Sequence, residues 1–337
     1  MGFRKVICAA IICICVAGAA IAVDVRDGWF QSTENAIFSS PLIVDLDGDQ
    51  KDEIVVMDLD DKLYVYDDTG VIYDPGSQPW PVTMSFGQGS ISSVAAGDID
   101  GDNNLELVVV GYDTVVEASK VKVYETNGTL LVSQVLYSGA TGKATPCLID
   151  CYRHDGTNTH PEKEIVIRDG DGKVHVLYWN GSGLTDLYAT TAMDTTDDSS
   201  QEDLYGRYPI TSSVAAASIS TTETLMAVGS TDGYVHRWVV SSNSVTPWSV
   251  TTMSSLACDN PTTTSRFLSS PVITDLESDG SLETIIGGMD NKVYVWNENG
   301  TPRTGWPKSV YQSITSSPAV ADVDGDGRLD ALLSGPR

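Results

Sequence analysis

Basic residues are scarce in this sequence, and their scarcity excludes one large class of partners. The 337 residues include 20 Lys and Arg against 46 Asp and Glu, which gives a formal net charge of −26. Binding to a phosphate backbone needs a clustered basic face, so nucleic acid is excluded as a partner. Strong acidity is also typical of disordered chains, but 41% of the residues are hydrophobic and the apolar runs are regular. This composition favours a packed core over disorder.

Recognisable catalytic motifs are also missing. The sequence has no G-x-S-x-G nucleophile elbow, no glycine-rich phosphate loop and no H-E-x-x-H zinc motif. No nucleophile stands in a recognisable relation to a general base. We therefore expect a protein that is not an enzyme.

Cysteine is too sparse for a disulfide framework. Three of the six cysteines lie in the first 15 residues, which leaves Cys147, Cys151 and Cys258. An odd number argues against a dense set of disulfides. The spacing of Cys147 and Cys151 to His154 and His160 fits no standard zinc pattern. Cys147 takes the place of an apolar strand residue, so we expect a buried thiol there.

Long hydrophobic runs are absent except at the N-terminus. Arg4 and Lys5 precede an apolar run from Val6 to Ala19, and an A-x-A cleavage signature ends at Ala22. We predict that residues 1–22 are a signal peptide; an uncleaved anchor is the alternative, although the run is short for a membrane span. Cleavage changes the formal charge from −26 to −28. The mature chain, without a membrane span, would then be secreted or displayed at the cell surface, with the periplasm as the alternative.

A sixfold internal repeat occupies the rest of the chain. Strand-like segments of the type SSPLIVD start near residues 39, 92, 144, 212, 269 and 316. A polar loop, a second apolar run such as EIVVMD, a tight turn and an alternating third run such as DKLYVYD follow each start. A weaker fourth run completes the unit. No helical periodicity of useful length interrupts this pattern.

Four short strands in about 50 residues are the signature of a β-propeller, whose four-stranded antiparallel blades bury their faces by stacking. We predict that residues 23–337 are an all-β propeller with five full repeats and a partial sixth. A β-sandwich is the alternative, but it would not need the same unit so many times. Residues 28–41 align without gaps with residues 305–318. This match predicts that residues 28–38 are an outer strand that closes a blade, and we expect the chain to be truncated within the sixth repeat.

Four repeats carry a nine-residue acidic loop between the first two strands, with carboxylates at positions 1, 3, 5 and 9. Ca²⁺ takes about six to eight oxygen ligands, which a tight loop with alternating carboxylates supplies. Four carboxylates this close would repel one another without a cation. Flanking strands exclude an EF-hand, and a solvated turn is the alternative for any single loop. The pattern predicts about four Ca²⁺ sites, formed by Asp45, Asp47, Asp49 and Glu53; Asp98, Asp100, Asp102 and Glu106; Asp275, Glu277, Asp279 and Glu283; and Asp322, Asp324, Asp326 and Asp330.

The third and fourth repeats depart from this pattern. The fourth has serine and threonine in the loop that starts at Ser218, and we predict no metal there. In the third, an insertion follows Asp150, and Asp155, Glu162 and Glu164 could rebuild a site.

Repeats of the form SSPAVADVDGDGRLDALLSG resemble the FG-GAP/VCBS family and are similar to the N-terminal β-propeller of integrin α-subunits. The resemblance covers essentially everything after residue 27 and implies that the D-x-D-G-D-x-x-x-D/E loops bind Ca²⁺. It implies a secreted or cell-surface recognition or adhesion module with an extracellular protein or carbohydrate ligand. The alternative is a propeller-type polysaccharide lyase, or a non-catalytic domain of a larger extracellular enzyme, because such propellers also occur in enzymes.

Overall fold

The structure is a computed structural model, and every regular element in its described part is a β-strand. The all-β prediction is therefore confirmed. In the described residues no helix is long and apolar enough to cross a membrane. The signal segment 1–22 lies outside the described residues. These are residues 29, 31–76, 80–87, 92–138, 144–151, 162–168, 173–186, 193–194, 212–220, 223–230, 233–241, 249–257 and 267–334.

The first three repeats form three antiparallel sheets in which neighbouring strands follow one another along the chain. The first blade contains β1 (Leu42–Val44), β2 (Glu53–Met57), β3 (Lys62–Tyr66) and β4 (Val82–Thr83). The second contains β5 (Ala95–Gly97), β6 (Glu106–Asp113), β7 (Ala118–Glu125) and β8 (Leu130–Ser138). The third contains β9 (Cys147–Ile149), β10 (Glu164–Arg168), β11 (Lys173–Trp179) and β12 (Leu184–Asp186), and β13 (Met193–Asp194) also pairs with β11.

The last three repeats continue the same order. The fourth blade contains β14 (Ala215–Ser218), β15 (Glu223–Gly229), β16 (Tyr234–Ser241) and β17 (Ser249–Ala257). The fifth contains β18 (Val272–Thr274), β19 (Glu283–Gly288), β20 (Lys292–Trp296) and β21 (Lys308–Ser309). The sixth sheet has two strands, β22 (Ala319–Ala321) and β23 (Asp330–Leu332). Five full blades and a partial sixth are as predicted.

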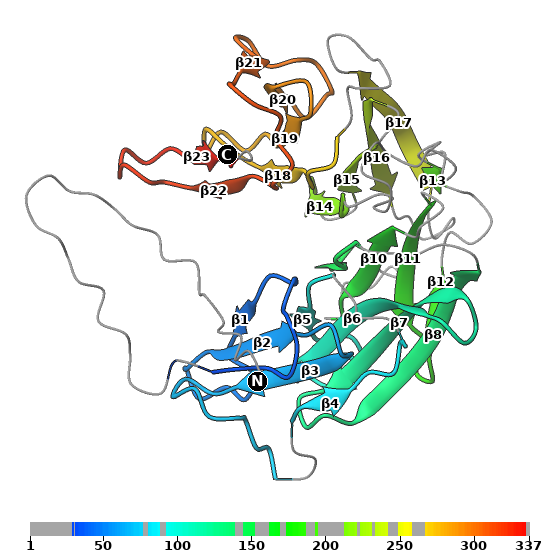
Figure 1. The fold of residues 1–337 in the computed structure, drawn as a ribbon. Helices are drawn as coiled ribbons and strands as arrows, with labels where there is room; N and C mark the ends of the chain where they lie inside the picture. The colour runs from blue at the N-terminus through cyan, green and yellow to red at the C-terminus, as the bar shows by residue number, and fades with distance from the viewer. Residues whose placement is uncertain are drawn as a thin grey trace, which may run out of the picture.

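The blades follow one another in chain order around a common centre (Figure 1). Their first strands face this centre, and contacts join β5 to β9, β9 to β14, and β14 to β18. The second strands are buried on both faces, as in β2 and β6. In β2, Val55 and Met57 pack toward the second blade, while Val56 packs in a separate cluster with Tyr64 and Tyr66.

The paired serines that begin the repeats make two different kinds of hydrogen bond. The first serine bonds within its own blade: the Ser269 hydroxyl donates to Gly287 O (2.8 Å) and accepts from Gly287 N–H (3.2 Å). The second residue of the pair links neighbouring blades. Its backbone N–H donates to the side-chain hydroxyl of the corresponding residue in the next repeat. This chain of hydrogen bonds, with N···O distances between 2.8 and 3.1 Å, runs through Ser40, Ser93, Thr145, Ser213, Ser270 and Ser317.

The predicted outer strand over residues 28–38 is not a strand in the described residues, where no regular element precedes Leu42. The reason is the lack of a strand to pair with. Lys308 and Ser309 of the matching segment form β21 by pairing with β20, but the structure describes no such neighbour beside residues 31–32. The segment instead packs on the first blade through Trp29 and Ile37.

Candidate metal centres

The acidic loops fold in the same way because their own side chains cap their backbone. In the first loop, the Asp45 carboxylate accepts from the N–H groups of Gly48 (2.7 Å) and Gln50 (2.9 Å). Glu53, the first residue of β2, accepts from the N–H of Leu46 (2.8 Å). Gly48 and Gln50 have left-handed backbones with φ of 79° and 69°, a conformation that glycine adopts without strain.

The second and sixth loops repeat this geometry. Asp98 accepts from Gly101 (2.7 Å) and from the N–H of Asn103 (3.0 Å). Asp322 accepts from Gly325 (2.7 Å) and Gly327 (2.9 Å). The local sequence alone is therefore sufficient to form the loop, whichever blade contains it.

Three of the four predicted loops bring three carboxylates together. In each group, one ligand oxygen per residue lies within 4.8 Å of the others. The groups come from positions 1, 3 and 9, and position 5 belongs to none of them. Asp49, at position 5, instead accepts from the N–H of Lys51 (2.9 Å) and pairs with its ammonium group (3.3 Å). The three groups are Asp45, Asp47 and Glu53; Asp98, Asp100 and Glu106; and Asp322, Asp324 and Asp330.

The second loop shows most directly that its residues fit a cation. Glu106 is fully buried, and its Oε1 atom has no hydrogen-bond partner. Burial raises the pKa of Glu106 to about 8, and the nearby carboxylates of Asp100 and Glu125 add to the rise. A buried oxygen without a donor, facing other carboxylates, is the arrangement that a hard cation such as Ca²⁺ satisfies.

The sixth loop has the same carboxylates in a more open setting. Glu53 and Glu106 are buried at position 9, whereas Asp330 is exposed. Asp330 begins β23, whose only partner in the described residues is β22. The three candidate centres therefore share their loop geometry but differ in shielding from water.

The fifth loop departs from the prediction, although all of its residues lie in the described part of the chain. Its carboxylates do not form a group of the kind seen in the other three loops. The Arg303 guanidinium lies among them, pairing through Nη2 with Glu277 and through Nη1 with Glu283 (3.0 Å). The hydrogen bond from Arg303 to Glu277 further raises the pKa of the guanidinium. The fifth loop therefore has a cation supplied by the protein.

Tyr73 holds in the first blade the position that Arg303 holds in the fifth, and its side chain also reaches the acidic loop of its own blade. Tyr73 and Arg303 each donate their backbone N–H to the third strand of their blade, to Val65 O (2.9 Å) and Val295 O (3.0 Å) respectively. The Tyr73 hydroxyl donates to Asp47 Oδ2 (3.4 Å). Neither Tyr73 nor Arg303 was predicted from the sequence, although an alignment of the turns after the third strands would have placed both opposite the loops.

The third repeat retains only part of the pattern. Glu164 takes position 9, because it begins β10 and accepts from the N–H of Cys151 (2.8 Å). Glu162 lies instead against the second loop, where a Cβ added to Gly101 would stand 2.6 Å from its Oε1. Asp155 lies outside the described residues, so a third-repeat site stays a prediction.

The two cysteines beside this loop are free thiols. Cys147 and Cys151 are partly buried and pack against the cluster that contains Val166 and Trp238. Burial raises the pKa of Cys147 to about 11. This packing agrees with the expected role as an apolar strand residue. His154, His160 and Cys258 lie outside the described residues.

Comparison with solved structures places the fold in the β-propeller class. The chain is similar to BBS1N in the crystal structure of its complex with ARL6DN soaked with lead, with 13% identity and a TM-score of 0.50 over 92% of this chain and 82% of that one. It is also similar to Saccharomyces cerevisiae Sqt1, with 16% identity and a TM-score of 0.51 over 84% of this chain and 66% of that one. At these identities the similarities show the fold alone.

Comparison with protein families identifies the repeats. The FG-GAP-like repeat model matches residues 45–109 and 262–333. These two regions contain all three carboxylate groups described above. The chain therefore carries FG-GAP-like repeats in these two regions, and the FG-GAP part of the resemblance inferred from its sequence is confirmed. A comparison with curated proteins gave no match.

Proposed function

We propose that this chain is a secreted or cell-surface Ca²⁺-binding propeller that recognises an extracellular protein or carbohydrate. The observation that carries the metal assignment is the convergence of three carboxylates within 4.8 Å in each of three loops. The predicted signal peptide, residues 1–22, supports export. The scarcity of basic residues supports a ligand other than nucleic acid.

The ions would act on the blades rather than on a substrate. Each loop joins the first strand of its blade to the second, so a bound Ca²⁺ would fix the inner edge of the blade. Three loops would bind Ca²⁺ in this proposal, and Arg303 would take the ion's place in the fifth. Rigid blades would in turn hold the connecting loops in the fixed positions that recognition requires.

Calorimetric titration of the chelator-treated chain with Ca²⁺ tests the metal assignment. We expect about three ions per chain, and about two after Asp98→Asn, which removes one carboxylate charge from the second loop. Asp52→Asn is the matched control, because Asp52 is exposed and belongs to no carboxylate group. Absence of binding heat in the folded wild-type chain would refute the assignment.

The recognition role needs a separate test. Immobilised extracellular matrix proteins, together with acidic and neutral polysaccharides, should be presented to the chain in Ca²⁺ and in EDTA. We expect saturable, Ca²⁺-dependent retention on one of them. New ultraviolet absorbance from unsaturated sugar ends during incubation with an acidic polysaccharide would replace the proposal with a lyase.

A further inference from the structure

The second acidic loop differs from the first and the sixth in what lies against it. At the fourth position of these loops, a Cβ added to Gly48 or Gly325 would meet nothing within 4 Å. A Cβ added to Gly101 would stand 2.6 Å from Oε1 and 2.9 Å from Cδ of Glu162, which belongs to the third repeat. A carboxylate of the third blade therefore lies against the acidic loop of the second.

The second loop is also more shielded from water at its third position. Asp47 and Asp324 are exposed at this position of the first and sixth loops, whereas Asp100 is half-buried. Like charges repel more strongly where water is partly excluded, because the effective dielectric constant is lower. The second loop is therefore the one in which an additional carboxylate is least expected without a cation.

Backbone contacts hold Glu162 in this place. The N–H of the next residue, Lys163, donates to the carbonyl of Asp98 (2.7 Å), the first residue of the second loop. The Lys163 side chain lies over Gly97, where an added Cβ would stand 3.3 Å from its Cγ. Glu164 then begins β10, which pairs with β9 of the third blade. The residues that follow Glu162 thus fix its backbone beside the second loop.

The charge gathered at the second loop lacks a counter-ion among the described side chains. In that part of the chain, no Lys or Arg forms an ion pair with Asp98, Asp100 or Glu106. The fifth loop differs, because Arg303 pairs with two of its carboxylates. Oε1 of Glu106 is also buried without a hydrogen-bond partner. A further carboxylate against this group is unfavourable unless a cation lies between them.

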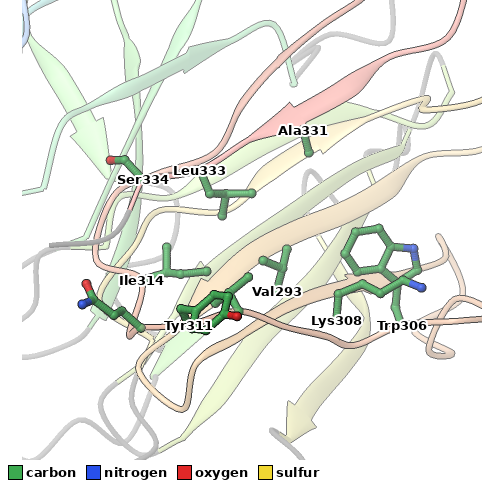
Figure 2. Close-up of a pocket in the computed structure, with 10 residues that line it drawn as sticks. Val293, Trp306, Lys308, Tyr311, Ile314, Ala331, Leu333 and Ser334 are labelled. Atoms are coloured by element: carbon green, nitrogen blue, oxygen red, sulfur yellow. The ribbon is translucent and has the colours of Figure 1, made fainter. Parts of the chain in front are cut away.

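The joint between the fifth and sixth sheets offers a comparison. Its apolar cluster contains Val293, Ile314, Ala331 and Leu333. Figure 2 shows Leu333 across from Ile314 and Val293. The second and third blades share a cluster of the same kind, which contains Ile99 and Ile165. Apolar packing therefore explains how neighbouring blades adhere, but it does not explain why Glu162 lies on an acidic loop.

We propose that Glu162 is an additional ligand of the cation in the second loop, so that this site joins the second blade to the third. The proposal rests on the Ca²⁺ binding proposed above. Ca²⁺ takes about six to eight oxygen ligands, and the loop itself brings three carboxylates together. Coordination positions therefore remain for an oxygen from outside the loop. Loss of the Glu162 carboxylate should weaken the second site alone.

Titration of the chelator-treated full chain with Ca²⁺, in competition with a chromophoric chelator, tests the proposal. Glu162→Gln should weaken the binding of one ion by about tenfold or more. In the Asp98→Asn background, which removes a carboxylate of the second site, Glu162→Gln should leave the remaining ions unaffected. Glu117→Gln is the matched control, because Glu117 is exposed in the turn at the far end of β6 and should leave binding unchanged.

The melting temperature supplies a readout that a purely structural role of Glu162 would not reproduce. In excess Ca²⁺, Glu162→Gln should melt at a lower temperature than the wild type, because the ion loses a ligand. In EDTA it should melt no lower, because the substitution removes a carboxylate that repels the loop. An equal loss in both conditions would show that Glu162 acts through packing alone, and would overturn the proposal.

The two proposals fail in different ways. Wild-type Ca²⁺ affinity at every site of Glu162→Gln would overturn the role of Glu162 and leave the metal assignment intact. Absence of Ca²⁺ binding by the folded wild-type chain would overturn both.

Discussion

Removing a single carboxylate charge from the second loop should cancel about one third of the Ca²⁺-dependent stability. A ligand that binds only the folded state, at about 100 times its dissociation constant, stabilises by about 2.7 kcal/mol per site. Three loops in different blades, with three separate carboxylate groups, would then contribute about 8 kcal/mol. Asp98→Asn should lower that sum to about 5 kcal/mol, because Asp98 belongs to one group only.

Differential scanning calorimetry in excess Ca²⁺ and in EDTA measures this difference. For chains of this size about 1 kcal/mol moves the melting temperature by roughly 2 °C. Chelation should therefore lower the melting temperature of the wild-type chain by about 16 °C, and that of Asp98→Asn by about 11 °C. Asp52→Asn changes the same charge at an exposed position and should respond like the wild type.

Arg303 provides a test in the opposite direction. Arg303→Leu removes the guanidinium that pairs with Glu277 and Glu283, leaving two acidic groups without their cation. We expect the variant to be less stable in EDTA and to gain a larger response to Ca²⁺ than the wild type. Equal melting curves with and without chelator for the wild-type chain would refute the reasoning for all loops.

Three further predictions concern the blades themselves. Ser269→Ala should lower the free energy of unfolding by about 2 kcal/mol in urea denaturation, because both backbone groups of Gly287 lose a buried partner. Gly287→Ala should cost about 1–3 kcal/mol, since the added Cβ would meet Ile314 Cγ2 at 2.3 Å. Burial raises the pKa of Glu164 to about 7. The wild-type chain should therefore lose stability as the pH rises from about 4.5 to 7, because the unfolded chain releases the Glu164 proton before the folded chain does. Over this range the free energy of unfolding of Glu164→Gln should rise by about 3 kcal/mol relative to that of the wild type. A constant difference between the two chains from pH 4 to 8 would contradict that pKa.

Most of the fold was predictable from the sequence because a blade is a local unit. The second strands and the alternating third strands appear where the apolar runs predicted them, as in β2 and β3. The acidic loops were also predictable, since Asp45 caps the backbone only a few residues further on. The strand predicted at residues 28–38 was wrong because a strand needs a neighbour, and a single segment does not contain one.

The serine pairs can be recognised in the sequence, but their hydrogen-bond partners cannot be predicted from it. The sequence shows that Ser39 and Ser40 recur at the start of repeats. It does not show that Ser39 bonds to Met57 within its blade while Ser40 bonds to Ser93 of the next one. The two partners differ because the backbone turns one hydroxyl inward and exposes the N–H of the next residue to the neighbouring blade.

By itself, therefore, the sequence determined the repeat, its strands and the acidic loops, because hydrogen bonds between near neighbours form them. Tertiary structure alone decided how these loops differ. It buries Glu106 but leaves Asp330 exposed, and it brings Arg303 onto the fifth loop. These differences arise between segments far apart in the chain, and so depend on how each blade packs against the next.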